Sequence, residues 1–131
     1  MQTIKRLPDS ELEIMKIIWK ANGSVCSAYI QEHLKMKKKW AACTILGFLT
    51  RLVDKGFITC EKHGKTNIYT AIVEEKEYLQ FESKTFLEKV YGNSLESLVS
   101  ALYHGKSIDK EDLKKLQEYI DEMVNEHDKG G

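Results

Sequence analysis

The sequence predicts a mainly α-helical protein with a small β-hairpin: a winged helix-turn-helix domain at residues 1–73 and a helical dimerisation domain at residues 74–131. Three observations predict this fold class. Apolar residues recur at helical spacing in residues 40–56, strand-like runs flank a glycine-containing turn in residues 57–72, and helical stripes return after residue 74. A helix followed directly by a hairpin is the order expected of a recognition helix and its wing.

Composition excludes several classes of protein. At 131 residues, the chain is one domain, or one small domain with an extension. It has no run of about 18 apolar residues and no apolar secretory signal, so we expect a cytoplasmic protein without membrane insertion. Cys26, Cys43 and Cys60 form no CxC or CxxC pair, and His33 has no partner at ligand spacing. We therefore expect reduced thiols, no metal and no cofactor, with redox sensing by Cys43 left open.

Charge is divided between the two halves, although the whole chain is formally neutral. Residues 1–65 carry 12 Lys or Arg against 6 Asp or Glu, and residues 66–131 carry 8 against 14. A basic half joined to an acidic half is typical of a protein that binds nucleic acid at one end and is solvated or oligomerises at the other. Runs of charge on solvated helices give the same imbalance by chance, so charge alone does not identify DNA as the partner.

Two helices are expected before the central one. Ser10 and Glu13 match the capping-box pattern for a first helix that runs to about Ala21 and stops at residues 22–23. Ser27 can cap a second helix after a short extended link. The expected core face of the first helix comprises Leu12, Ile14, Met15, Ile17, Ile18 and Trp19.

The central helix has a weak start, because Ala41 stands where a capping side chain is expected, and its stop signal is Gly56. The expected buried stripe comprises Ile45, Leu46, Phe48, Leu49, Leu52 and Val53. The expected exposed face comprises Cys43, Thr44, Gly47, Thr50, Arg51 and Asp54. This face holds one cation and no amide, so it predicts little bidentate recognition of base edges.

Lysines flank the central helix on both sides. Residues 37–39 lead into it, and an expected hairpin turn at residues 62–65 joins strands 57–61 and 67–72. These cations suit phosphate contacts, although a solvated loop and turn explain them nearly as well.

Three residues of the exposed face have expected roles. Thr44 can contact a base, with its methyl group reaching thymine, and Gly47 permits close approach. Arg51 suits a phosphate, or alternatively an intrahelical pair with Asp54. The candidate DNA-binding residues are therefore Lys37, Lys38, Lys39, Cys43, Thr44, Gly47, Arg51, Lys62 and Lys65.

The C-terminal part is expected to form three amphipathic helices. The first carries an apolar stripe through residues 78–91 and breaks at residues 92–93; Ser94 caps the second, and Ser107 begins the third. The tail from residue 126 is expected to fray. Because these helices lack an obvious local core, a homodimer partner would supply the packing surface. The expected dimer interface comprises Leu98, Leu102, Leu113, Leu116, Ile120 and Met123.

Four strings carry a family resemblance: LPDSELEIMKIIW at residues 7–19, the run from Trp40 to Ile58, GKTNIYTAIVEEKEY at residues 64–78, and KTFLEKVYGNSLESLVSAL at residues 84–102. Together they resemble the penicillinase-repressor (BlaI/MecI/CopY) family of bacterial transcriptional repressors. The resemblance covers nearly the whole chain.

The resemblance implies a winged-helix dimer that binds a palindromic operator in double-stranded DNA and represses genes for β-lactam resistance or metal export. In the β-lactam branch, a membrane sensor protease, or a protease downstream of it, triggers cleavage of the repressor. The cleaved Asn-Phe pair of that branch corresponds here to Ala101-Leu102. This chain lacks the CxC motifs of the copper branch, and has Cys43, Leu46 and Gly47 where β-lactam members carry polar or basic residues.

We therefore expect a sequence-specific, DNA-binding transcriptional repressor that acts as a homodimer. The alternative is a winged-helix module that binds another protein without specific DNA recognition, which the poor base-reading face of the central helix favours. Salt dependence separates the two, because DNA binding releases counterions. The sequence contains no nucleophile motif, phosphate loop or pocket-flanked carboxylate pair, so no enzyme activity is expected.

Overall fold

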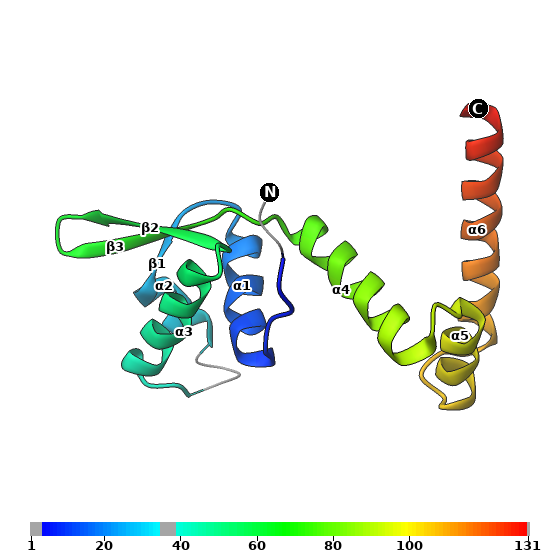
Figure 1. Ribbon diagram of the computed structural model, residues 1–131, viewed down its shortest axis with the longest axis horizontal. Coiled ribbons are helices and arrows are strands. Elements are labelled where there is room, and N and C mark those ends of the chain that lie inside the picture. Colours follow the sequence, from blue (N-terminus) through cyan, green and yellow to red (C-terminus); the bar gives the residue numbers. More distant parts are fainter. Residues whose placement is uncertain (1–3, 35–38, 131) are drawn as a thin grey trace. The chain divides into compact units, whose positions relative to one another are not determined.

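The computed structural model describes residues 4–34 and 39–130 (Figure 1). The chain forms two compact units, residues 1–83 and residues 84–131, and the long helix α4 (Glu75–Tyr91) contributes to both. Helices with one small antiparallel sheet confirm the expected fold class. The assignment of separate functions to residues 1–73 and 74–131 stays a prediction.

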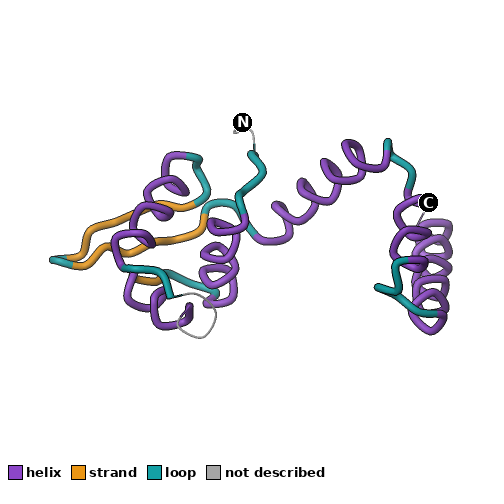
Figure 2. The backbone as a smooth tube through the Cα atoms, turned by 90° about the horizontal axis from the view of Figure 1, so that it is seen from below, coloured by secondary structure: helices purple, strands orange, loops and turns teal. Residues whose placement is uncertain are grey.

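The N-terminal unit contains the expected helices and hairpin. Its sheet has the order β1-β3-β2, so the short strand β1 pairs with β3 on the edge opposite to β2. Figure 2 shows β2 and β3 running together to the tip of the hairpin. The elements before α4 are α1 (Asp9–Ala21), β1 (Val25–Cys26), α2 (Ser27–Leu34), α3 (Ala42–Asp54), β2 (Ile58–His63) and β3 (Thr66–Ala71).

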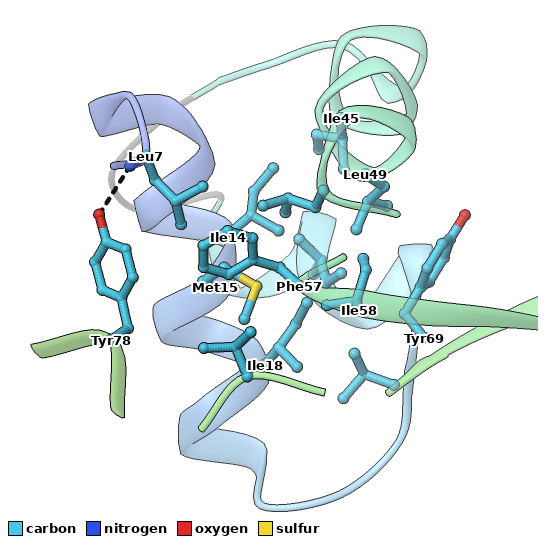
Figure 3. Close-up of a cluster of buried hydrophobic side chains, with 14 of the residues drawn as sticks. Leu7, Ile14, Met15, Ile18, Ile45, Leu49, Phe57, Ile58, Tyr69 and Tyr78 are labelled. Atoms are coloured by element: carbon cyan, nitrogen blue, oxygen red, sulfur yellow. Dashed lines mark hydrogen bonds between the residues drawn. The ribbon is translucent and has the colours of Figure 1, made fainter. Parts of the chain in front are cut away.

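One apolar core holds this unit together (Figure 3). On α3, the buried residues Ile45, Leu49 and Leu52 recur at intervals of three and four, so the opposite side of the helix faces solvent. The central helix therefore sits on the core through one face, as its sequence predicts. The largest fully buried side chains are Ile14, Met15, Ile18, Ile30, Leu34, Ile45, Leu49, Leu52, Phe57, Ile58 and Tyr78.

The capping box expected at Ser10 and Glu13 is wrong. Helix α1 begins at Asp9, and its N-cap is Pro8, which makes no side-chain capping bond. The Leu12 N–H donates to the Pro8 carbonyl at 3.0 Å, so the first helical hydrogen bond is already formed ahead of Ser10. Proline fixes φ near the helical value, which favours a helix that begins directly after it.

The hairpin turn is also tighter than expected. His63 pairs with Thr66, so only Gly64 and Lys65 form the loop, and Lys62 belongs to β2 rather than to the turn. Gly64 has a φ of 66°, as the first central residue of a type II′ turn requires. The glycine thus permits the shortest common hairpin connection, and both strands reach further toward the turn than the sequence indicates.

Tyr78 anchors the start of α4 in the core. Its side chain is fully buried, and its hydroxyl oxygen accepts a hydrogen bond of 2.8 Å from the buried N–H of Leu7 (Figure 3). Its ring lies 5.6 Å from that of Phe57 and 5.8 Å from that of Trp19, whose Nε1 donates to the Val73 carbonyl. Burial, as the largest cause, raises the pKa of Tyr78 above its ordinary value.

Tyr78→Phe is expected to lower the free energy of unfolding by about 1–3 kcal/mol, because the buried Leu7 N–H loses its acceptor. The same variant should flatten the alkaline loss of stability. Because folding raises the Tyr78 pKa above 10.0, the stability linked to the neutral phenol is complete below pH 10.0 and is lost as pH rises through the folded value.

Urea denaturation at near-neutral pH and above pH 10.0 checks both effects. Tyr119→Phe is the control, because Tyr119 is exposed on α6 (Lys110–Gly130) and should change neither. Equal alkaline losses in the wild type and in Tyr78→Phe would contradict the role of this phenol.

The C-terminal unit consists of the end of α4 together with α5 (Leu95–His104) and α6. α4 ends where expected, because Gly92 and Asn93 have φ values of 53° and 68°. The Ser94 hydroxyl accepts from the Ser97 N–H at 3.2 Å, which confirms Ser94 as the cap of α5. Among residues 84–126, no side chain is buried. This unit therefore has no closed core of its own within the part that the structure describes.

The expected start of the third C-terminal helix is wrong. α6 begins at Lys110 rather than at Ser107, because Asp109 and Asp112 cap its start reciprocally, with N–H to carboxylate distances of 2.9 and 3.0 Å. The expected cap at Ser107 is displaced by this stronger arrangement of two acids. α6 continues to Gly130, and the expected fraying of the tail from residue 126 stays a prediction.

Candidate nucleic-acid interface

Helix α3 presents an open face to solvent. Cys43, Thr44, Thr50, Arg51 and Asp54 are exposed as expected, and Gly47 is half-buried. A Cβ atom at Gly47 would have no neighbour within 4 Å, so this glycine leaves a shallow, bare stretch of backbone on the face. The arrangement gives a helix surface that another macromolecule can approach closely.

The start of α3 is uncapped, as the sequence predicts. Ala41 is its N-cap residue and makes no side-chain capping bond. The Thr44 N–H donates to the Ala41 carbonyl at 3.0 Å. The N–H groups of Ala42 and Cys43, by contrast, have no partner among the described residues and can donate to an anion, which the positive end of the helix dipole favours. Lys39, two residues earlier, is exposed and adds a cation beside this end. Lys37 and Lys38 lie outside the described residues.

The hairpin supplies the second cationic element. Lys62 on β2 and Lys65 in the two-residue loop are both exposed. From Lys62 to Lys65 every side chain is exposed, and Figure 1 shows the hairpin extending from the body of the unit. Near the tip, Glu61 lies 3.3 Å from His63, so an acid is also present. The hairpin resembles a wing that can contact phosphates through its lysines.

Arg51 is positioned by aromatic side chains. Its guanidinium carbon lies 5.6 Å from the centre of the Phe48 ring, which in turn meets Trp40 edge-on at 5.1 Å. Among the side chains of residues 4–34 and 39–126, none forms an ion pair with Arg51, so the expected alternative of a pair with Asp54 is not present. The guanidinium group lies within cation–π distance of the Phe48 ring, and no hydrogen bond from it to the described residues is present.

The expected burial of Leu46 on α3 is wrong. Its side chain is 41% exposed, whereas Phe48 and Val53 are half-buried. Leu46 follows Ile45 by one residue and therefore lies about 100° around the helix from the centre of the buried side. Leu46 therefore lies at the margin of the open face of α3, a position that the apolar pattern of the sequence does not reveal.

An ion pair missed by the sequence reasoning fixes α3 in place. Nζ of Lys55, the C-cap residue of α3, lies 2.5 Å from Oε1 of Glu11 in the first turn of α1. The Glu11 side chain is 4% exposed and that of Lys55 is 25% exposed. Pattern analysis gives no signal for this pair, because the two residues are 44 positions apart.

The candidate dimer residues lie on α5 and α6. These helices border a groove of about 880 Å³, and its lining includes Leu113, Leu116 and Ile120 of the expected interface. Leu102 and Met123 are exposed outside the groove lining, and Leu98 is half-buried. Further apolar side chains, which were not part of the expected dimer interface, are exposed on the same unit: Phe86, Val90, Leu95, Tyr119 and Val124.

The candidate cleavage position lies inside a helix. Ala101 and Leu102 are exposed residues of α5, and the Ala101 carbonyl accepts from the Gly105 N–H at 2.9 Å. A protease would need to open this last turn of α5 before it could hold the peptide in an extended form.

Over the side chains of residues 4–34 and 39–126, no group of three or more His, Cys, Asp or Glu residues is placed to hold a metal ion. None of the helices in the same part of the chain has the length and apolar character needed to cross a membrane.

The sequence of this chain is similar to a known protein family and to proteins of known function. The model of the penicillinase repressor family matches residues 7–122. The chain is 30% identical over 125 residues to the penicillinase repressor of Bacillus licheniformis, across 95% of this chain and 97% of that protein. It is 36% identical over 119 residues to the methicillin resistance regulatory protein MecI of Staphylococcus aureus (strain N315), across 91% and 90%.

Two solved structures are similar as well. The DNA-binding domain of the repressor BlaI matches with a TM-score of 0.52 and 35% identity, over 60% of this chain and 94% of that structure. The monomeric form of Bacillus licheniformis BlaI in complex with the blaP half-operator matches with a TM-score of 0.50 and 33% identity, with the same coverage.

Proposed function

This chain belongs to the penicillinase repressor family of DNA-binding transcriptional repressors, and we propose that it represses as a homodimer on a palindromic operator. The family is one of repressors and not of enzymes. The protein would act in the cytoplasm, where its operator DNA lies.

The open face of α3 is the observation that supports operator binding most strongly. Thr44 and Gly47 lie on it, Arg51 lies further along the same helix, and the uncapped N-terminus of the helix is adjacent. In this proposal the first part of α3 enters the major groove, where residues near the start of a recognition helix meet base edges. Lys39, Lys62 and Lys65, together with Lys37 and Lys38 of the preceding loop, contact phosphates and set the register.

The homodimer follows from the surface of the C-terminal unit. Leu116 and Ile120 line an open groove, and Met123 lies one turn further along α6. A monomer would leave this apolar surface in water, whereas a second copy of the chain can cover it with the same surface. Two linked winged helices then bind two half-sites, which supplies the specificity that one short helix lacks.

Induction by proteolysis is a further part of the proposal. A membrane sensor protease, or a protease downstream of it, would cut at Ala101-Leu102. Because α5 lines the groove, a cut within α5 would weaken the dimer and release the operator.

Arg51→Ala is expected to weaken operator binding and to reduce the slope of log K against log salt by about one for each half-site, because each Arg51 contributes one phosphate contact. The measurement is a titration of operator DNA at several salt concentrations. Lys115→Ala is the control, since it removes the same charge from an exposed position on α6. An unchanged slope in Arg51→Ala would remove Arg51 from the phosphate contacts.

A gel-shift titration of DNA from upstream of the gene tests the function itself. A discrete shift that survives competitor DNA and weakens steeply with salt is expected. Binding lost entirely to competitor would favour the alternative function, a winged-helix module that binds another protein.

A further inference from the structure

Leu46 is a large apolar side chain on the surface that we propose for operator binding. Helix α3 begins at Ala42, so Leu46 lies just over one turn from the helix N-terminus, in the part of a recognition helix that meets bases. It follows Cys43 by three residues and Ala42 by four, and both of those residues are exposed. Leu46 thus shares its side of the helix with the start of the open face.

The polar groups around Leu46 are poorly suited to reading base edges. The Thr50 hydroxyl, one turn further on, already donates to the Leu46 carbonyl at 2.9 Å. The other exposed side chains nearby are those of Ala42, Cys43 and Thr44, and of these only Thr44 offers a hydroxyl for a base or phosphate. Direct readout by hydrogen bonds in the major groove relies on arginine, lysine, asparagine and glutamine. None of these occurs between Ala42 and Thr50 of α3.

The backbone beside Leu46 allows a close approach. Gly47 is the next residue, and a Cβ atom there would meet nothing within 4 Å, so packing inside the protein does not explain the absence of a side chain. The missing side chain leaves room for the edge of a base pair next to Leu46. The apolar group that a base pair exposes in the major groove is the 5-methyl group of thymine.

We propose that Leu46 is a specificity-determining residue that recognises a thymine in each operator half-site by packing against its 5-methyl group. The contact removes apolar surface of both partners from water, and cytosine and the purines offer no such methyl group. This inference rests on the proposed function, since it assigns a readout to the same helix face.

The test uses deoxyuridine, which lacks only the 5-methyl group of thymidine. Operator DNA is first selected with the full-length chain from a random double-stranded pool, and each thymine is then replaced singly. At one thymine of each half-site, the replacement is expected to weaken binding by about fourfold, the effect of one buried methyl group. Leu46→Ala is expected to weaken binding to the thymine operator and to abolish that difference.

Leu79→Ala is the matched control. Leu79 is a similarly exposed leucine, at 50%, but lies on α4 outside the proposed interface. This variant should keep the full penalty for deoxyuridine. Leu46→Ala should leave the salt slope unchanged, because leucine contacts no phosphate.

The possible failures are distinguishable. If no sequence is selected from the pool, the proposed function fails, and the inference fails with it. If an operator is selected but every deoxyuridine replacement leaves the affinity unchanged, only the role of Leu46 is overturned. The same conclusion follows if Leu46→Ala retains the penalty.

Discussion

Replacing Leu116 and Ile120 together with glutamate is expected to weaken binding to an operator with two half-sites by about 100-fold or more. Binding to an isolated half-site should change little. The effect is large because, once one subunit of a dimer is bound, the other subunit is held near the second half-site at a high effective concentration. A monomer keeps every contact with its own half-site but loses this advantage.

Leu116 and Ile120 line the groove between α5 and α6, where their side chains are 37% and 39% exposed. They are four residues apart and so point from the same side of α6. In the proposed dimer, two carboxylates there would have to be desolvated at a self-complementary interface.

Sedimentation analysis and titrations with one and two half-sites measure the two parts of this prediction. Lys114→Glu is the control, because it makes the same change in net charge at an exposed position of α6 that does not line the groove. A double variant that stays dimeric and binds the full operator like wild type would exclude this groove as the dimer interface.

Periodicity predicts the fold well where one face of an element is buried. The helix at residues 42–54 and the break after residue 91 appear as expected, because buried residues and turn residues leave local signals. Leu46 shows the limit of that reasoning. An apolar residue is counted as core by its type alone, but its angular position on the helix decides its burial, and here it is exposed.

Contacts between distant parts of the chain are the second limit. Ser10 looks like a cap, but Pro8 already starts the helix, held by the Leu7 contact with Tyr78. Likewise, Glu11 resembles an ordinary acid in a first helical turn, and its burial against Lys55 appears only in three dimensions. Local sequence carries no information about which residue 44 positions away will face such a carboxylate.

Lys55→Met is expected to lower the free energy of unfolding by about 3 kcal/mol, because removing the lysine from this partly buried ion pair leaves the charge of the buried Glu11 carboxylate uncompensated. The Glu11 carboxylate is 4% exposed in its side chain, so water cannot replace the lost ammonium group. Removing the other partner of the pair is expected to cost less stability. Glu11→Leu leaves Lys55, whose side chain is 25% exposed and can turn its ammonium group toward solvent, so this variant should lose less stability.

The double variant Glu11→Leu with Lys55→Met separates two contributions to stability: the penalty of leaving one buried charge unpaired, and the net contribution of the intact ion pair. It is expected to regain most of the stability lost in Lys55→Met, since two apolar side chains can fill the space without desolvated charge. Urea denaturation of the three variants measures this, with Lys20→Met as a control at an exposed position on α1. If the double variant were as unstable as Lys55→Met, the lost stability would come from lysine packing rather than from Glu11.

If instead stability recovers but operator affinity stays low, the pair orients α3 for DNA, because it joins the end of that helix to the start of α1.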